Sequence, residues 1–170
     1  QKEKLPLFNL FGFKDEILPK TSYTIAIGEL NEIDEKLEES EKCSILKVKL
    51  GTPNNDKEII SKIRARTDKL IRIDANEGWD YEMAKSMAFW LADRNVEFIE
   101  QPFSAINLKD TKRLKSISPL PLIADENSIS SNDLNGLVDF FDGINIKLMK
   151  CGSIDEALKM IGLAKKLKFK

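Results

Sequence analysis

Five ionisable side chains recur at nearly constant spacing, each at the end of a short run of aliphatic residues. They are Lys49, Asp74, Glu100, Asp125 and Lys147, with successive separations of 25, 26, 25 and 22 residues. Three carboxylates gathered in one place repel one another unless a cation lies between them. Oxygen ligands without His or Cys favour Mg²⁺ or Mn²⁺. The pattern therefore predicts a divalent cation site, against the alternative that each acid is an ordinary loop or capping residue.

Two lysines share one face of a predicted strand. Lys47 and Lys49 are two residues apart, and Val48 between them points to the other face. A solvated edge strand would also carry such a pair, but that alternative predicts an exposed second strand. A lysine beside a divalent cation and a second lysine should have a lowered pKa, as a lysine base near neutral pH requires. Asn145 and Lys147 repeat the arrangement further along the chain.

Composition excludes several classes of protein. The chain has 170 residues, 27 Lys and Arg against 28 Asp and Glu, and no His. The balanced charge argues against nucleic-acid binding, and the lack of His excludes Ser-His-Asp catalysis and His-ligated zinc. No apolar run is long enough for a membrane span, and the first residues do not resemble a signal peptide. We expect a cytoplasmic protein that does not bind membranes, with Cys43 and Cys151 as free thiols.

The elements that must position these residues alternate between strands and helices. Strands are predicted at 23–27, 45–50, 70–74, 96–100, 122–125 and 143–148. Amphipathic helices lie between them, one opened by a capping pair of Asn55 and Glu58 and the last by a capping box of Ser153 and Glu156. Strand–helix units in series predict a parallel sheet with right-handed crossovers.

Two architectures fit such a series: an open doubly wound sheet and a (β/α)₈ barrel. No Gly-x-Gly-x-x-Gly or Walker sequence follows any strand, which weakens the nucleotide-binding, doubly wound alternative. Strand ends one repeat apart open on the same rim of a barrel, where barrel enzymes hold their active sites. The even spacing of the charged strand ends therefore favours the barrel.

This geometry predicts a reaction. A cation that binds a substrate carboxylate offsets the charge that develops when the α-proton leaves, through an enolate intermediate. Lysines on the second and sixth strands approach the α-carbon from opposite sides, so that one removes the proton and the other returns one. The configuration inverts, which is racemisation or epimerisation.

Five motifs in order resemble a known family. They are Lys47-Val48-Lys49-Leu50-Gly51, Asp74-Ala75-Asn76-Glu77-Gly78-Trp79, Glu100-Gln101-Pro102, Ala124-Asp125-Glu126 and Ile146-Lys147-Leu148-Met149-Lys150-Cys151-Gly152. The sequence resembles the muconate lactonizing enzyme subgroup of the enolase superfamily, and within it the dipeptide epimerases of the L-Ala-D/L-Glu epimerase type. The resemblance runs from about Leu5 to Lys170.

The resemblance implies a role for each matching residue. Asp74, Glu100 and Asp125 would bind Mg²⁺, and Lys49 and Lys147 would be the two bases. Lys47 would contact the substrate carboxylate, and Thr24 matches a substrate-contacting position. The substrate would be a small molecule, a dipeptide or another carboxylate.

The chain departs from the family pattern in two residues and in length. Ser153 replaces the second of two glycines, and Asn127 stands where a Ser is common. Residues 1–20 would be the end of a capping domain and a linker, and residues 21–170 the barrel units one to six. A full barrel needs roughly 250 residues, so we expect a piece of a longer protein that forms a homo-oligomer when full length.

Several alternatives stay open at this point. Muconate-type cycloisomerase, o-succinylbenzoate synthase and N-acylamino acid racemase share the same lysines and carboxylates, and an inactive fragment is a further alternative. The side chain of Trp79 would either shape the mouth of the site or pack on a helix. Cys151 lies at the same rim, where packing within the turn is its expected role.

Overall fold

The sheet has the predicted parallel topology. The computed structural model describes residues 4–13, 19–26, 28, 30–52 and 54–170. Within these residues, six strands form one sheet in the order β1-β2-β3-β4-β5-β6, every neighbouring pair parallel. The strands are β1 (Ser22–Ile25), β2 (Ile45–Lys49), β3 (Leu70–Asp74), β4 (Val96–Glu100), β5 (Leu122–Ala124) and β6 (Gly143–Ile144).

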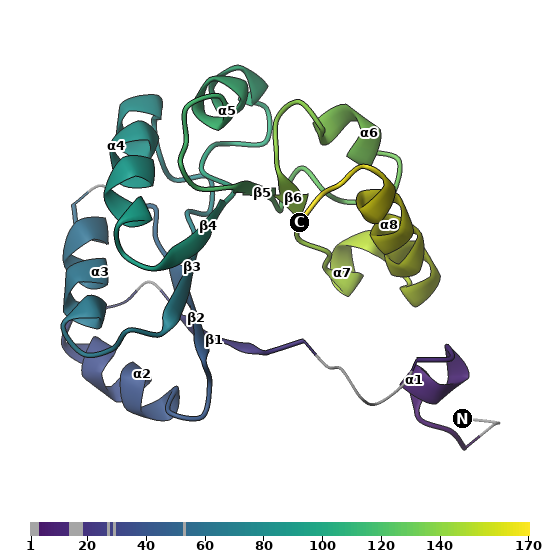
Figure 1. The fold of residues 1–170 in the computed structure, drawn as a ribbon, viewed down its shortest axis with the longest axis horizontal. Helices are drawn as coiled ribbons and strands as arrows, with labels where there is room; N and C mark the ends of the chain where they lie inside the picture. Colours follow the sequence, from purple (N-terminus) through teal and green to yellow (C-terminus); the bar gives the residue numbers. More distant parts are fainter. Residues whose placement is uncertain (1–3, 14–18, 27, 29, 53) are drawn as a thin grey trace.

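The helices lie outside a curved sheet, as in a barrel that follows only part of a circle (Figure 1). They are α1 (Leu7–Leu10), the 3₁₀ turn η1 (Leu30–Glu32), α2 (Ile33–Glu39), α3 (Asp56–Arg64), α4 (Tyr81–Ala92), α5 (Leu108–Lys115), α6 (Leu134–Leu137), α7 (Leu148–Cys151) and α8 (Ile154–Lys166). The short helix α1 lies apart from the sheet, on the open side of the arc. The strand order and the curvature confirm the α/β prediction of six consecutive barrel-type units.

The core lies between the outer face of the strands and the helices. Leu46 and Val48 of β2 are fully buried in it, as are Ile60 and Ile63 of α3. Burying one such side chain contributes about 1.5–3 kcal/mol. Because side chains alternate along a strand, the burial of Val48 places the two lysines of β2 on the inner face. β2 lies between β1 and β3 and is not an edge strand, so the edge-strand alternative is wrong.

Several predicted boundaries are wrong by a few residues. The sixth strand ends at Ile144, and Lys147 is the N-cap of the one-turn helix α7 rather than a strand residue. The fifth strand ends at Ala124, one residue before Asp125. The first strand is described as far as Ile25, and Ile27 lies outside the described residues.

The two predicted capping motifs differ in outcome. The side chain of Ser153 accepts a hydrogen bond from the Glu156 amide at 3.1 Å, which confirms half of the capping box. The Glu156 carboxylate does not complete the capping box, because its Oε1 accepts a hydrogen bond from the Ser131 amide instead. Asn55 is the N-cap of α3, as predicted, but its side chain makes no cap hydrogen bond, so the expected capping pair does not form.

Asp56 organises the start of α3 in its place. This carboxylate is 1% exposed and accepts hydrogen bonds from the amides of Gly51 and Thr52 at 3.0 and 3.2 Å. It also accepts one from Trp79 Nε1 at 2.7 Å. Asp56 therefore ties the loop after β2 to the loop after β3, and Trp79 packs in the core, 5% exposed, rather than lining an open mouth.

The same two loops touch backbone to backbone at paired glycines. Gly51 has φ +107°, and a Cβ there would lie 2.4 Å from the Ala75 carbonyl oxygen. A Cβ on Gly78 would lie 2.5 Å from the Gly51 carbonyl oxygen. This close approach aligns the ends of β2 and β3, where Lys49 and Asp74 are in register.

We expect Gly51→Ala to destabilise the protein by about 2 kcal/mol or more, because it combines a left-handed backbone with a backbone clash. Urea denaturation measures the change in the free energy of unfolding. Gly162→Ala within α8 is the matched control: a Cβ there meets nothing within 4 Å, and alanine should be neutral or stabilising by up to about 1 kcal/mol. Equal stability of the Gly51→Ala and control variants would contradict the prediction.

Candidate active site

Three carboxylates from consecutive strand ends meet on one rim of the sheet. Asp74 and Glu100 are in register as the last residues of β3 and β4, and Asp125 follows β5 directly. One oxygen of each carboxylate lies within 4.8 Å of the other two. All three residues are buried, with exposed fractions of 0%, 2% and 1%.

Lysines surround this cluster and offset its charge. Lys47 Nζ lies 3.0 Å from Asp74 Oδ2 and 2.8 Å from Glu100 Oε2. Lys49 Nζ lies 3.5 Å from Asp74 Oδ2 and donates to Asn76 Oδ1 at 2.9 Å. Without such partners, three buried carboxylates would be strongly destabilising.

On the other side of the cluster, two lysines at the start of α7 and within it contact Asp125. Lys147 Nζ donates to Oδ2 of this carboxylate, and Lys150 Nζ donates to Oδ1 and to the Asp125 backbone carbonyl. Lys49 and Lys147 thus contact different members of the carboxylate cluster. Thr24 is exposed, and its backbone pairs in register with Lys47 on the neighbouring strand.

The cluster shifts the pKa values of its members. Burial raises the pKa of Glu100, and hydrogen bonds from Lys47 offset this only in part. Burial also acts to raise the pKa of Asp125, but the hydrogen bonds of Lys147 and Lys150 outweigh it, and the pKa is lowered.

The pKa values of two lysines of the cluster are raised. Burial acts to lower the pKa of Lys47, but Glu100 and Asp74 outweigh it, and the pKa is raised. The pKa of Lys147 is raised in the same way, because its bond to Asp125 outweighs burial. The nearest groups are carboxylates, which favour the ammonium form; the lowered lysine pKa expected beside a bound cation stays a prediction.

Two polar side chains of this rim, to which the sequence alone assigned no role, position the carboxylates. Gln101 is 1% exposed, with φ +39°, and its Oε1 accepts the Asp125 amide at 2.9 Å. Its Nε2 donates to Asn127 Oδ1 at 2.7 Å, so Asn127 joins the same network. Asn145 Nδ2 donates to Glu100 Oε1 at 2.7 Å.

The donor set fits a hard divalent cation. Carboxylate oxygens from three elements converge, as Mg²⁺ prefers, with room in such sites for water or substrate oxygens. Glu126 Oε2 lies buried without a hydrogen-bond partner among the described residues. Burial and the charge of the adjacent Asp125 raise the pKa of Glu126. The charges of Glu77 and Asp74 act in the same direction, so the Glu126 carboxyl lies close enough to the cluster to respond to its charge.

Cys151 is the last residue of α7, half-buried, with its thiol near the backbone carbonyls of Leu148 and Ser153. This agrees with the packing role expected for it. In the part of the chain that the structure describes, no helix has the length and apolar character needed to cross a bilayer.

Comparison with known proteins assigns the family. A "Hydrophobic dipeptide epimerase" of Flavobacteria bacterium (strain MS024-2A) is 40% identical over 174 residues, covering 97% of this chain and 50% of that protein. An "L-Ala-D/L-Glu epimerase" of Bacteroides thetaiotaomicron is 42% identical over 161 residues, covering 94% of this chain and 42% of that protein. The chain thus spans about half the length of these relatives.

A solved structure of the dipeptide epimerase from Enterococcus faecalis V583, complexed with Mg and the dipeptide L-Leu-L-Tyr, superimposes with a TM-score of 0.88 at 34% identity. The match covers 100% of this chain and 50% of that one. The family model described as "Enolase C-terminal domain-like" matches residues 31–170. The chain therefore belongs to the enolase C-terminal domain-like family.

Proposed function

We propose that this chain supplies the first six βα units of a Mg²⁺-dependent dipeptide epimerase. The observation that carries the proposal is the buried triad of Asp74, Glu100 and Asp125 with a lysine at either side, Lys49 and Lys147. The relatives named dipeptide epimerases favour this reaction over cycloisomerisation or racemisation of N-acylamino acids.

The three carboxylates would hold Mg²⁺, which when bound offsets negative charge on the substrate carboxylate as the α-proton leaves. Lys49 and Lys147 would each serve one epimer. One lysine, as the free amine, takes the α-proton to its Nζ, so that the C–H bond breaks. The other lysine, as an ammonium, gives a proton to the opposite face of the α-carbon, and the configuration inverts.

The remaining residues would orient the substrate. Lys47 bridges Asp74 and Glu100, and its ammonium would also attract the substrate carboxylate. Thr24 lies beside it in register on β1 and would contact the dipeptide. The lysine that takes the α-proton must be a free amine at that moment. A cation held by Asp125 would compete with the Lys147 ammonium for that carboxylate and so release Lys147 toward the substrate.

The chain would be part of a longer protein. Residues 1–20 would end a capping domain, and further βα units would close the barrel beyond the six described here. Intact mass spectrometry of the protein from its natural source should give a mass well above the 19.3 kDa of this chain. A mass of 19.3 kDa would instead favour the inactive-fragment alternative.

Proton exchange tests the reaction. We expect the complete protein with Mg²⁺ in D₂O to add one mass unit at the α-carbon of Ala-Glu or hydrophobic dipeptides. Lys147→Met should lower epimerisation at least about 1,000-fold, because one of two proton-transfer groups is lost, while exchange persists with one epimer only. Lys112→Met, on the exposed face of α5, is the control and should leave the rate unchanged. Full epimerisation by Lys147→Met would exclude the two-base mechanism.

Metal dependence tests the triad. Removal of divalent cations by EDTA should abolish exchange, and added Mg²⁺ should restore it. Asp74→Asn should weaken Mg²⁺ binding about 100-fold or more, because it removes one charged ligand from a three-carboxylate site. Isothermal titration calorimetry measures this affinity, with Asp139→Asn on the surface as the control. Mg²⁺ binding by Asp74→Asn with the wild-type affinity would show that the triad is not the site.

A further inference from the structure

Asp125 is held on three sides by groups other than the two remaining carboxylates. The Asp125 backbone amide donates a hydrogen bond to Gln101 Oε1. Lys150 Nζ donates to the Asp125 backbone carbonyl and to Oδ1, and Lys147 Nζ donates to Oδ2. Both atoms that Lys150 contacts thus belong to one residue. A single ammonium bonded to the backbone and the side chain of one residue restricts its rotamer.

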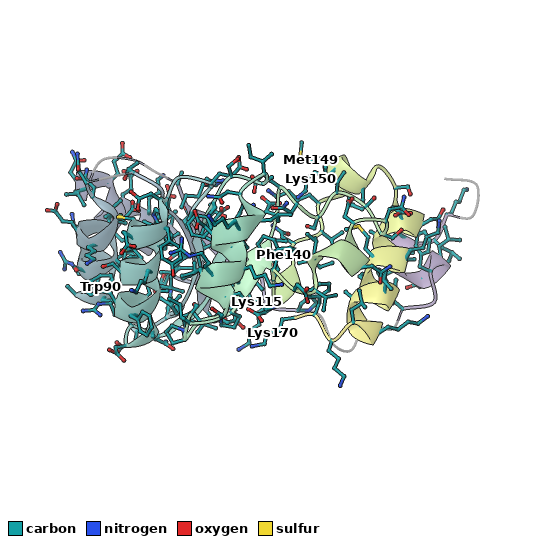
Figure 2. The ribbon with its side chains drawn as sticks, turned by 90° about the horizontal axis from the view of Figure 1, so that it is seen from above. Trp90, Lys115, Phe140, Met149, Lys150 and Lys170 are labelled. Carbon is teal, nitrogen blue, oxygen red and sulfur yellow. The ribbon has the colours of Figure 1, made fainter. Side chains whose placement is uncertain are left out.

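The helix α7 brings Lys150 to this position. Lys147 is its N-cap, and the Lys150 amide donates to the Lys147 carbonyl at 2.9 Å. The helix ends after one turn at Gly152, with φ +81°. Met149, between the two lysines, is 90% exposed, whereas the Lys150 side chain is 21% exposed. In Figure 2, which shows the sheet from its side, Met149 and Lys150 lie at one rim, and Lys115 and Lys170 lie toward the opposite rim.

The two lysines differ in what they contact. Lys147 contacts a single carboxylate oxygen and its side chain is 37% exposed, so it is the less enclosed of the two. Lys150 is more enclosed and bonds to two oxygens. Of the two, Lys150 has the contacts of a fixed support and Lys147 those of a group that can exchange partners.

We propose that Lys150 is a positioning residue for the cation site. It binds Asp125 Oδ1 and the backbone carbonyl, and so presents Oδ2 in a fixed orientation for a cation and for Lys147. Fixing a ligand before the cation arrives removes an ordering cost from binding, and outer partners of ligands commonly change metal affinity by 10–100-fold. This inference rests on the proposed function.

Simple electrostatics gives the opposite expectation. An ammonium this close to a cation repels it, so removal of Lys150 would tighten Mg²⁺ binding if charge alone mattered. A positioning role predicts weaker binding instead. The direction of the change in Mg²⁺ affinity therefore distinguishes a positioning role from simple charge repulsion.

The test measures Mg²⁺ affinity by isothermal titration calorimetry in the complete protein, with thermal unfolding measured for each variant. We expect Lys150→Met to weaken Mg²⁺ binding about tenfold, with kcat at saturating Mg²⁺ changing less than the Mg²⁺ concentration for half-maximal rate. Lys150→Arg, which keeps a charged donor, should restore most of the affinity. Lys159→Met, which removes an exposed lysine of α8, is the control and should bind as the wild type does.

Unchanged or tighter Mg²⁺ binding by Lys150→Met would overturn the positioning role while leaving the proposed function intact. A wild-type protein that binds no Mg²⁺ would instead overturn the proposed function. Should Lys150→Met fail to fold, Lys150→Gln keeps a neutral donor and is measured in the same way. Weaker binding by Lys150→Gln supports the proposal, and unchanged or tighter binding overturns it.

Discussion

The mutual repulsion of three buried carboxylates is the constraint on which the rim of this protein depends. Asp74, Glu100 and Asp125 are at most 2% exposed and lie within a few ångströms of one another. Burial removes the water that would otherwise stabilise them, so counter-charges must come from the protein or from a cation. Lys47 and Lys150 supply part of that charge at fixed positions.

The fold brings these charged side chains together because all strands of a parallel sheet end on the same side of the sheet. Side-chain alternation along β2 turns Leu46 and Val48 outward to the helices and Lys47 inward to the carboxylates. The same strand thus contributes to the core and to the site. Destabilising the outer packing would also displace the inner lysines.

The loops beyond the strand ends form a second level of organisation. Asp56 and the paired glycines join the loops after β2 and β3, and Gln101 with Asn127 joins those after β4 and β5. These contacts use backbone amides and carbonyls, which any sequence possesses. Their specificity comes from a few side chains whose hydrogen bonds are short and buried, and the proposed epimerase chemistry would depend on the alignment that they maintain.

The sequence by itself determined the order of the strands, the inward-facing residues of β2 and the three acidic residues of the site. Side-chain alternation and repeat spacing can be read from the sequence, and parallel pairing of the strands in register turns both into positions in space. Only the tertiary structure decided the rest. It showed that Lys147 is the N-cap of a helix rather than the end of a strand, that the Asp56 side chain, and not that of Asn55, makes the hydrogen bonds at the start of α3, and that Lys150 and Gln101 hold Asp125. Lys150 and Gln101 lie 25 and 24 residues from Asp125, in different units, and no local pattern specifies which long side chain reaches which oxygen across the rim.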